Sequence, residues 1–261
     1  MDPNQQPAAN ATKAEADLAA FVAEHRQHLP QLPERVDVHA PFLHVEEGFF
    51  DEQCRKAAER AELRRKAELR ARFAELCMAA GDRYARCTLE NFDAKHPKQK
   101  QVLTEVLAYV AADCPGGLVL YGPIGTGKDH LAFAVCRECI RSGKTVKWLN
   151  GRQWFGSIRD AMDSTKTEAA IIDEVRRPDV VCLSDPLPPI GALTPHQADM
   201  LYRFIDARYC RGATTICTLN VENDADADER LGVPTWDRLC DNSYKLHCSW
   251  ASYRKPVREV R

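Results

Sequence analysis

A short apolar segment, Leu118–Tyr121, runs directly into a glycine-rich loop that ends in lysine, and a helical pattern follows over His130–Cys136. The loop has the form Gly-x-x-x-x-Gly-Lys, which acts as a phosphate cradle when a strand precedes it and a helix follows it. Its glycines let successive backbone N–H groups turn toward an anion, and the helix N-terminus adds partial positive charge. We therefore expect a parallel sheet with an anion site at its carboxyl edge.

The candidate nucleotide-binding residues are Gly122, Pro123, Ile124, Gly125, Thr126, Gly127, Lys128, Asp129 and His130. Lys128 is expected to reach the β- and γ-phosphates of a nucleotide. The next position ordinarily carries serine or threonine, whose hydroxyl binds Mg²⁺, but this chain has Asp129. A carboxylate about 4 Å from a phosphate is repelled by roughly 4 kcal/mol at an effective dielectric constant near 20, unless a cation lies between them. The site is therefore either disabled or unusually dependent on metal.

A nucleotide site also needs an apolar strand that ends in acidic residues. Residues 178–185 provide a good candidate, because the apolar run Val180–Leu183 is followed by Ser184 and Asp185. Ile171–Glu174 is closer to the literal motif, but it has only two apolar residues before its acids and lies in a helical pattern. We prefer the first segment and keep the second as an alternative.

Short apolar runs alternate with amphipathic helical patterns after Gly81, which is typical of a parallel α/β sheet. Strands are expected at 118–121, 146–149, 180–183, 214–218 and 244–248, and helices at about 128–142, 152–163 and 195–209. Thr194 and Pro195 suit the N-cap and first position of the last helix. The predicted fold is a three-layer α/β/α sandwich with a parallel sheet, preceded by a helical N-terminal segment.

Composition adds limits on location and on domain organisation. Hydrophobic residues make up 44% of the chain and charged residues 28%, and no apolar run or N-terminal signal indicates a membrane span or secretion. The scattered cysteines, 11 in number, favour a reducing cytoplasm. We expect a flexible arm at 1–49, a basic charged helix that binds a partner at 50–82, and a nucleotide-binding core with a basic tail at 83–261.

Two further clusters are not expected to bind metal. Cys136 and Cys139 lie inside a helical pattern without a second pair at zinc spacing. The acidic stretch 222–229 lacks the glycine and the terminal glutamate of a calcium loop, so a solvated loop is expected there.

From about residue 83 to 255 the chain resembles the DnaC/IstB-like AAA+ ATPases, which include bacterial helicase loaders and helper ATPases of insertion sequences. The resemblance rests on six motifs in order: Cys87-Thr-Leu-Glu-Asn-Phe92, the loop at 122–129, the strand at 180–185, Thr218-Leu-Asn220, Asp237-Arg238-Leu239 and Ser252-Tyr253-Arg254. It implies an AAA+ P-loop ATPase that binds ATP and Mg²⁺.

The resemblance also implies roles for single residues. Asp185 matches the catalytic base, and Asn220 matches a sensor that positions the attacking water. Arg238 matches a finger that completes the site of a neighbouring subunit, and Arg254 matches a second sensor on the γ-phosphate. A planar guanidinium suits both roles because charge spreads over several oxygens in the transition state.

The chain departs from the family pattern at the metal. Ser184 occupies the position of the metal-binding acid, while Asp129 occupies the position of the metal-binding hydroxyl. The two residues look like a reciprocal exchange that conserves the set of ligands, so Asp129 and Ser184 are the predicted metal residues. Placing Asp185 in the metal position would instead leave Pro186 as the base. The rival interpretation is a decayed site with weak nucleotide binding.

The functional hypothesis is an ATP-binding helicase loader or transposition helper that self-associates and acts on DNA, expected to be single-stranded, with a replicative helicase or a transposase as partner. ATP hydrolysis is expected to be weak and stimulated by assembly or DNA. The alternative is a degenerate, non-hydrolysing scaffold. A small-molecule kinase is disfavoured, because nothing after Lys144 resembles a lid or an acceptor pocket. The proline-rich segment 185–191 is either a rigid spacer or a partner contact.

Overall fold

The computed structural model describes residues 49–162 and 167–254. Residues 1–48 of the expected arm and the part of the expected basic tail after residue 254 therefore lie outside the described residues. The chain divides into two compact units, residues 1–56 and 57–261, and the second unit contains the sheet and the candidate site. None of the helices in the described ranges combines the length and apolar character that crossing a membrane requires.

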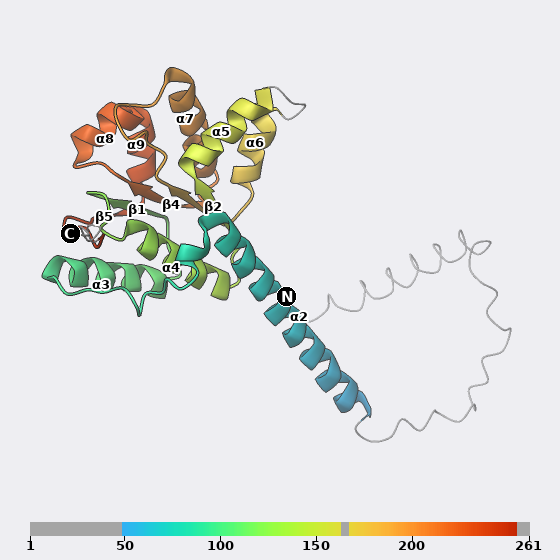
Figure 1. Cartoon of the computed structure of the whole chain (residues 1–261). Helices are drawn as coiled ribbons and strands as arrows, with labels where there is room; N and C mark the ends of the chain where they lie inside the picture. Colours follow the sequence, from blue (N-terminus) through green and yellow to red (C-terminus); the bar gives the residue numbers. More distant parts are fainter. Residues whose placement is uncertain (1–48, 163–166, 255–261) are drawn as a thin grey trace, which may run out of the picture. The chain divides into compact units, whose positions relative to one another are not determined.

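In the described residues a long helix, a short turn and a further helix precede the sheet, whose strands then alternate with one or two helices each (Figure 1). The helices are α2 (Phe49–Ala80), the 3-10 turn η1 (Asp82–Tyr84), α3 (Pro97–Ala111), α4 (Lys128–Arg141), α5 (Gly151–Met162), α6 (Glu168–Arg176), α7 (Pro195–Tyr209), α8 (Asp224–Leu231) and α9 (Val233–Cys240). The strands are β1 (Gly117–Tyr121), β2 (Val146–Asn150), β3 (Val180–Ser184), β4 (Thr214–Leu219) and β5 (Ser243–His247).

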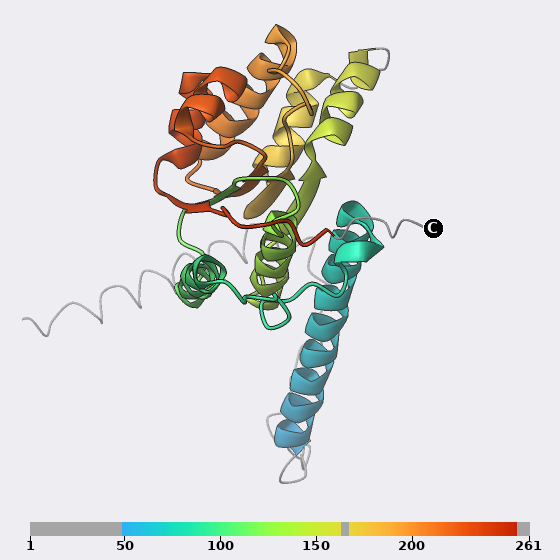
Figure 2. The same cartoon turned by 60° about the vertical axis from the view of Figure 1, so that its left-hand side comes forward.

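The five strands form one sheet in the order β2-β3-β4-β1-β5, and every neighbouring pair is parallel. Helices α3 and α4 cover one face, and α5 to α9 cover the other (Figure 2). The three-layer sandwich predicted from the sequence is confirmed. Parallel strands end at the same edge, so Tyr121, Ser184 and Leu219 bring their following loops together.

Each face of the sheet has its own apolar core. One core packs α3 and α4 against the sheet around Tyr109, Leu131 and Phe133, all fully buried. The other packs α5 to α9 around Met200 and Phe204. Burial on both sides explains why β3 appears in the sequence as a continuous apolar run rather than an alternating one.

Side chains that cap helix N-termini account for where three helices begin. Thr194 is the N-cap of α7, as its sequence suggested, and it also forms a reciprocal capping box with Gln197. Thr167 caps α6, so Ile171–Glu174 is helical and the alternative acidic strand is excluded. The solvated loop expected at 222–229 was wrong in part, because Asn223 caps α8, whose first turn carries acidic residues that favour a helix N-terminus.

A fully buried arginine ties the amino ends of two strands to the helical layer. Arg208 donates from Nε to Thr215 Oγ1 at 3.0 Å and from Nη1 to the carbonyl oxygens of Val175 at 2.8 Å and Pro178 at 3.0 Å. Burial lowers the pKa of its guanidinium to about 10. The side chain remains a cation at neutral pH and is satisfied by backbone oxygens rather than by a carboxylate.

Candidate nucleotide site

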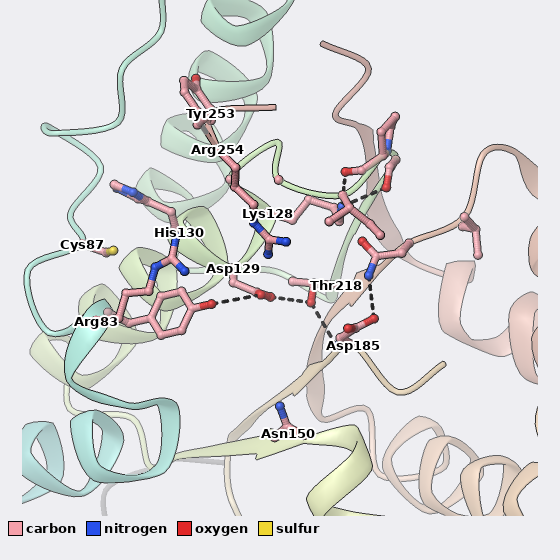
Figure 3. Close-up of a pocket in the computed structure, with 18 of the residues that line it drawn as sticks. Arg83, Cys87, Lys128, Asp129, His130, Asn150, Asp185, Thr218, Tyr253 and Arg254 are labelled. Carbon is pink, nitrogen blue, oxygen red and sulfur yellow. Dashed lines mark hydrogen bonds between the residues drawn. The ribbon is translucent and has the colours of Figure 1, made fainter. Parts of the chain in front are cut away.

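A cavity of about 810 Å³ opens where the carboxyl ends of β1, β3 and β4 meet (Figure 3). It is lined by the glycine-rich loop, by the segment before α3, and by the segment after β5. Nearly all of the predicted site residues lie on its wall: Gly122, Pro123, Ile124, Gly125, Gly127, Lys128, Asp129, His130, Asp185, Asn220 and Arg254. Two other predicted residues, Thr126 in the loop and Ser184 at the end of β3, are buried and do not line the cavity.

The loop conformation requires glycine at positions 125 and 127 as well as at Gly122, whose φ is 134°. Gly125 and Gly127 have φ values of 83° and 86°, a region that residues with a side chain rarely adopt. A Cβ on Gly125 would also lie 2.0 Å from Ser252 Oγ, and one on Gly127 would lie 2.9 Å from a ring carbon of Phe92. Gly127 is the N-cap of α4, so the loop leads straight into the positive end of that helix.

The segment after β5 holds the loop from outside. The Tyr253 N–H donates to Gly125 O at 2.9 Å, and the indole Nε1 of Trp250 donates to Thr126 O at 2.9 Å. These bonds satisfy two carbonyls of the loop and leave the N–H groups of the cradle for a ligand. The cradle is thus built by segments more than a hundred residues apart.

Lys128 is folded back onto the loop. Its Nζ donates to Gly122 O at 2.8 Å and to Pro123 O at 2.7 Å, and only 6% of the residue is exposed. Burial is the main cause that lowers the pKa of Lys128 below its usual value. A phosphate would offer this desolvated cation a stronger partner than two neutral carbonyls.

Asp129 accepts hydrogen bonds from three hydroxyl groups. Its Oδ1 accepts from Ser184 Oγ at 3.0 Å, and its Oδ2 accepts from the Tyr84 phenol at 3.3 Å. Oδ1 also accepts from Thr218 Oγ1 at 2.7 Å (Figure 3). Burial and the nearby Asp129 charge raise the pKa of Tyr84 to about 12, so the phenol keeps its proton at neutral pH. The carboxylate is fixed by donors from β3, β4 and η1.

The oxygen atoms of Asp129, Ser184 and Thr218 lie together and fit Mg²⁺, which prefers oxygen ligands. The described residues contain no group of three or more His, Cys, Asp or Glu side chains that could hold a metal. A cation beside Asp129 would therefore complete its shell with nucleotide phosphate and water, as Mg²⁺ commonly does. The two residues of the predicted exchange, Asp129 and Ser184, are in direct contact, whereas the Asp185 carboxylate bonds to Asn220 instead.

Asp185 and Asn220 form a second polar pair at the same edge. Asn220 Nδ2 donates to Asp185 Oδ1 at 2.7 Å, and the Asp185 N–H donates to Thr218 O at 3.1 Å. Asp185 has a left-handed backbone with φ 47°, which aspartate and asparagine tolerate better than most residues. Burial, followed by the charge of Asp129, raises the pKa of the Asp185 carboxyl.

Replacing Asp185 with asparagine should raise the melting temperature at pH 7. The carboxyl has a higher pKa in the folded state than in the unfolded state, so its contribution favours folding only at low pH and is lost as pH rises through the folded pKa. Asparagine avoids this loss and can still accept from Asn220. Melting curves of wild type and Asp185→Asn should therefore converge below about pH 3.8, the ordinary pKa of the group. Equal melting temperatures at pH 7, or the same gain in the exposed control Asp160→Asn, would contradict the assignment.

The remaining predicted site residues lie in different parts of the structure. Arg254 lies on the cavity wall, facing the loop. The His130 ring contacts Thr88 O through Nε2 at 2.8 Å, so it joins the segment before α3 to α4. Arg238, on α9, does not line this cavity: its Nε pairs with Asp206 Oδ1 at 3.0 Å and its guanidinium lies 4.7 Å from the Tyr202 ring centre.

Sequence reasoning missed several residues of the site. Tyr84 precedes the first family motif by three positions, and its aromatic side chain gives no sign of contact with a loop 45 residues away. Thr218 belongs to a motif that pointed only to Asn220. Arg230 holds the proline-rich segment by donating to Pro188 O at 2.7 Å and Asn220 O at 2.8 Å.

The parallel sheet, the glycine cradle at the start of α4 and the polar strand ends define a P-loop nucleotide-binding fold of the AAA+ type. Comparison with known proteins identifies the family within this class. A model of the family "IstB-like ATP binding protein" matches residues 55–260, and the chain belongs to this family.

Individual relatives agree with the family. The replicative helicase loader DnaC of Escherichia coli strain K12 is 25% identical over 178 residues, which cover 66% of this chain and 70% of the loader. A protein of insertion sequence IS5376 from Geobacillus stearothermophilus is 26% identical over 245 residues, covering 91% of this chain and 93% of that protein. A crystal structure of the DnaC helicase loader superposes with a TM-score of 0.58 at 23% identity, over 64% of this chain and 99% of that one, and supports the fold alone.

Proposed function

We propose that the protein is an ATP-binding helper of a DNA-processing partner, acting in the cytoplasm as a helicase loader or a transposition helper. One observation carries the nucleotide part of this proposal. The carboxylate of Asp129 lies beside the hydroxyls of Ser184 and Thr218, directly after the glycine cradle. In this proposal a carboxylate and hydroxyls serve Mg²⁺, with the carboxylate on the loop and a hydroxyl on the strand.

Each group of residues in the site would have its own role in ATP binding and hydrolysis. The loop N–H groups and Lys128 would hold the β- and γ-phosphates, and Asp129 with Ser184 would hold Mg²⁺, which supplies neutralising charge at these oxygens. Asn220 keeps Asp185 oriented, so this pair would hold the attacking water and accept its proton. Arg254 would contact the γ-phosphate from the segment that already supports the loop.

Arg238 supports self-association. It lies outside the cavity of its own chain, partly exposed on α9 with its side chain 29% accessible. An arginine in this position would serve the site of a neighbouring subunit, so one subunit alone lacks a charge that hydrolysis requires. We therefore expect weak turnover that rises on assembly.

Mixing two inactive variants tests this arrangement. Lys128→Ala subunits lose their own site but keep the finger, whereas Arg238→Ala subunits lose the finger but keep the site. If the finger acts across the interface, an equimolar mixture should recover part of the phosphate release that each variant lacks, because some interfaces pair an intact site with an intact Arg238. Phosphate release would be measured with and without single-stranded DNA.

The control mixture combines Lys128→Ala with a double variant that lacks both residues, and it should stay inactive. Full activity of Arg238→Ala alone, or no recovery in the mixture when both variants still associate, would contradict a finger in trans. Wild type without turnover under any of these conditions would favour the degenerate scaffold.

The partner is proposed from the relatives and from helix α2. One relative is a replicative helicase loader and another comes from an insertion sequence, so a replicative helicase or a transposase is the proposed partner. Within 57–80 most side chains of α2 are exposed, including Leu63 and Met78 at 66% and 82% exposure. We propose residues 50–82 as the partner-binding segment and 83–261 as the ATPase core, with single-stranded DNA as its nucleic-acid ligand.

A second candidate function is a scaffold that does not hydrolyse ATP. It is favoured by the fact that Asp129 already has three hydroxyl donors, which partly compensate its charge without any cation. Such a protein would bind its partner with nucleotide bound weakly or not at all.

A further inference from the structure

Tyr84 connects the end of α2 to the metal side of the nucleotide site. It closes the turn η1, which begins two residues after α2 ends, at Asp82. Its ring stacks on Phe133 with centroids 6.1 Å apart and lies 6.0 Å from the ring of Trp148. Its hydroxyl donates to Asp129 Oδ2. The ring is thus packed in the core while its polar end touches the unusual residue of the phosphate loop.

The last turns of α2 pack on the same support. Leu76 is 2% exposed, and the ring of Phe73 meets the edge of Phe133 at a centroid distance of 6.3 Å. The guanidinium of Arg137 lies 5.0 Å from the centre of the Phe73 ring. Phe133 therefore touches both Phe73 and Tyr84, and a shift of α2 on α4 would move the phenol relative to Asp129.

The phenol completes the support of the Asp129 carboxylate. Ser184 and Thr218 both donate to Oδ1, and Tyr84 is the described residue whose hydrogen bond reaches Oδ2. Without it the carboxylate is held at one oxygen and can turn about its last bond. Hydrogen bonds to a metal-binding carboxylate from outside the metal shell typically change metal affinity by about 10- to 100-fold.

We propose that Tyr84 is a positioning residue for Asp129, and that through it the docking of α2 on the core sets how strongly nucleotide binding depends on Mg²⁺. This inference rests on the proposed nucleotide site and adds its regulation by the partner-binding helix. A partner that pulls α2 away from Phe133 would weaken the Mg²⁺-bound state without touching the phosphate cradle.

The test compares nucleotide binding across Mg²⁺ concentrations in the full chain. For Tyr84→Phe, the Mg²⁺ concentration that gives half-maximal binding of a fluorescent ATP analogue should rise about tenfold. Affinity for the analogue in chelator should stay the same, because the cradle and Lys128 are intact. The matched control is Tyr109→Phe, which removes another buried phenol, bound to Gly116 O at 3.1 Å, away from the site.

A second pair of variants tests the link to α2. Phe73→Ala should raise the required Mg²⁺ concentration in the same direction, whereas Leu63→Ala, on an exposed position of the same helix, should not. An unchanged Mg²⁺ requirement in Tyr84→Phe, or equal losses with Mg²⁺ and with chelator, would overturn the role of Tyr84. An unchanged requirement in Phe73→Ala would overturn the coupling. If wild type itself bound no nucleotide, the proposed function would fail first, so the two failures are distinguishable.

Discussion

Replacing Lys128 with alanine should reduce the affinity for ATP by roughly a thousandfold. The ammonium group is desolvated at the base of the cradle, where it would face the β- and γ-phosphates. A unit charge about 4 Å from an anion contributes roughly 4 kcal/mol at an effective dielectric constant near 20, and this corresponds to about three orders of magnitude in the dissociation constant. Equilibrium titration with a fluorescent ATP analogue in the presence of Mg²⁺ measures the change directly.

The control for this prediction is Lys147→Ala. Lys147 lies on β2 and pairs with Glu174 at 3.3 Å, so the variant removes one positive charge from the protein without touching the cradle. Its affinity for ATP should remain within about twofold of wild type. Loss of binding in both variants would indicate a general charge effect or misfolding, and intact binding in Lys128→Ala would remove the central argument for a nucleotide site.

Exchanging the residues at positions 129 and 184 in one double variant should restore the binding of Mg²⁺-ATP that each single substitution weakens. Asp129→Ser leaves hydroxyls at both exchanged positions and a carboxylate at neither, so the advantage of Mg²⁺ over chelator should largely disappear. Ser184→Asp places two carboxylates in contact, where like charges about 4 Å apart repel by roughly 4 kcal/mol. The double variant Asp129→Ser/Ser184→Asp again has one carboxylate and one hydroxyl, now in the usual order, and should bind Mg²⁺-ATP about as well as wild type.

A double-mutant cycle provides the measurement. Nucleotide affinity is determined for the four proteins with Mg²⁺ and with chelator, and the coupling free energy should be large with Mg²⁺ and small in chelator. Thermal melting of each variant checks the fold. Additive losses in the double variant would show that the two positions do not share a metal, and equal affinity of wild type in both buffers would support a decayed site.

The sheet was predictable because its physical signals are local. The strands β1 and β3 are short apolar runs, and β1 leads into a glycine loop that only a few folds accommodate. The helix at 224–231 was missed because its acidic residues look like a solvated loop until Asn223 is seen to cap them. Capping depends on backbone geometry, which the residue types alone leave open.

The site was predictable where a motif carries its own chemistry, as at Lys128 and Asp129. Contacts that depend on tertiary packing were not. Tyr84 reaches Asp129 only because α2 packs on α4, and Arg208 finds its carbonyl partners only because three segments end at the same place. Neither residue belongs to a motif, so nothing in the sequence alone singles either of them out.

The hydrogen bonds that Trp250 and Tyr253 donate to the phosphate loop have a consequence for folding during synthesis of the chain. Thr126 and Trp250 are 124 residues apart, so the loop leaves the ribosome long before the residues that hold its carbonyls are added. A nascent chain that has exposed the loop still lacks β5 and the brace behind it. We therefore expect ATP binding to begin only after Trp250 and Tyr253 have been added and can hold the loop.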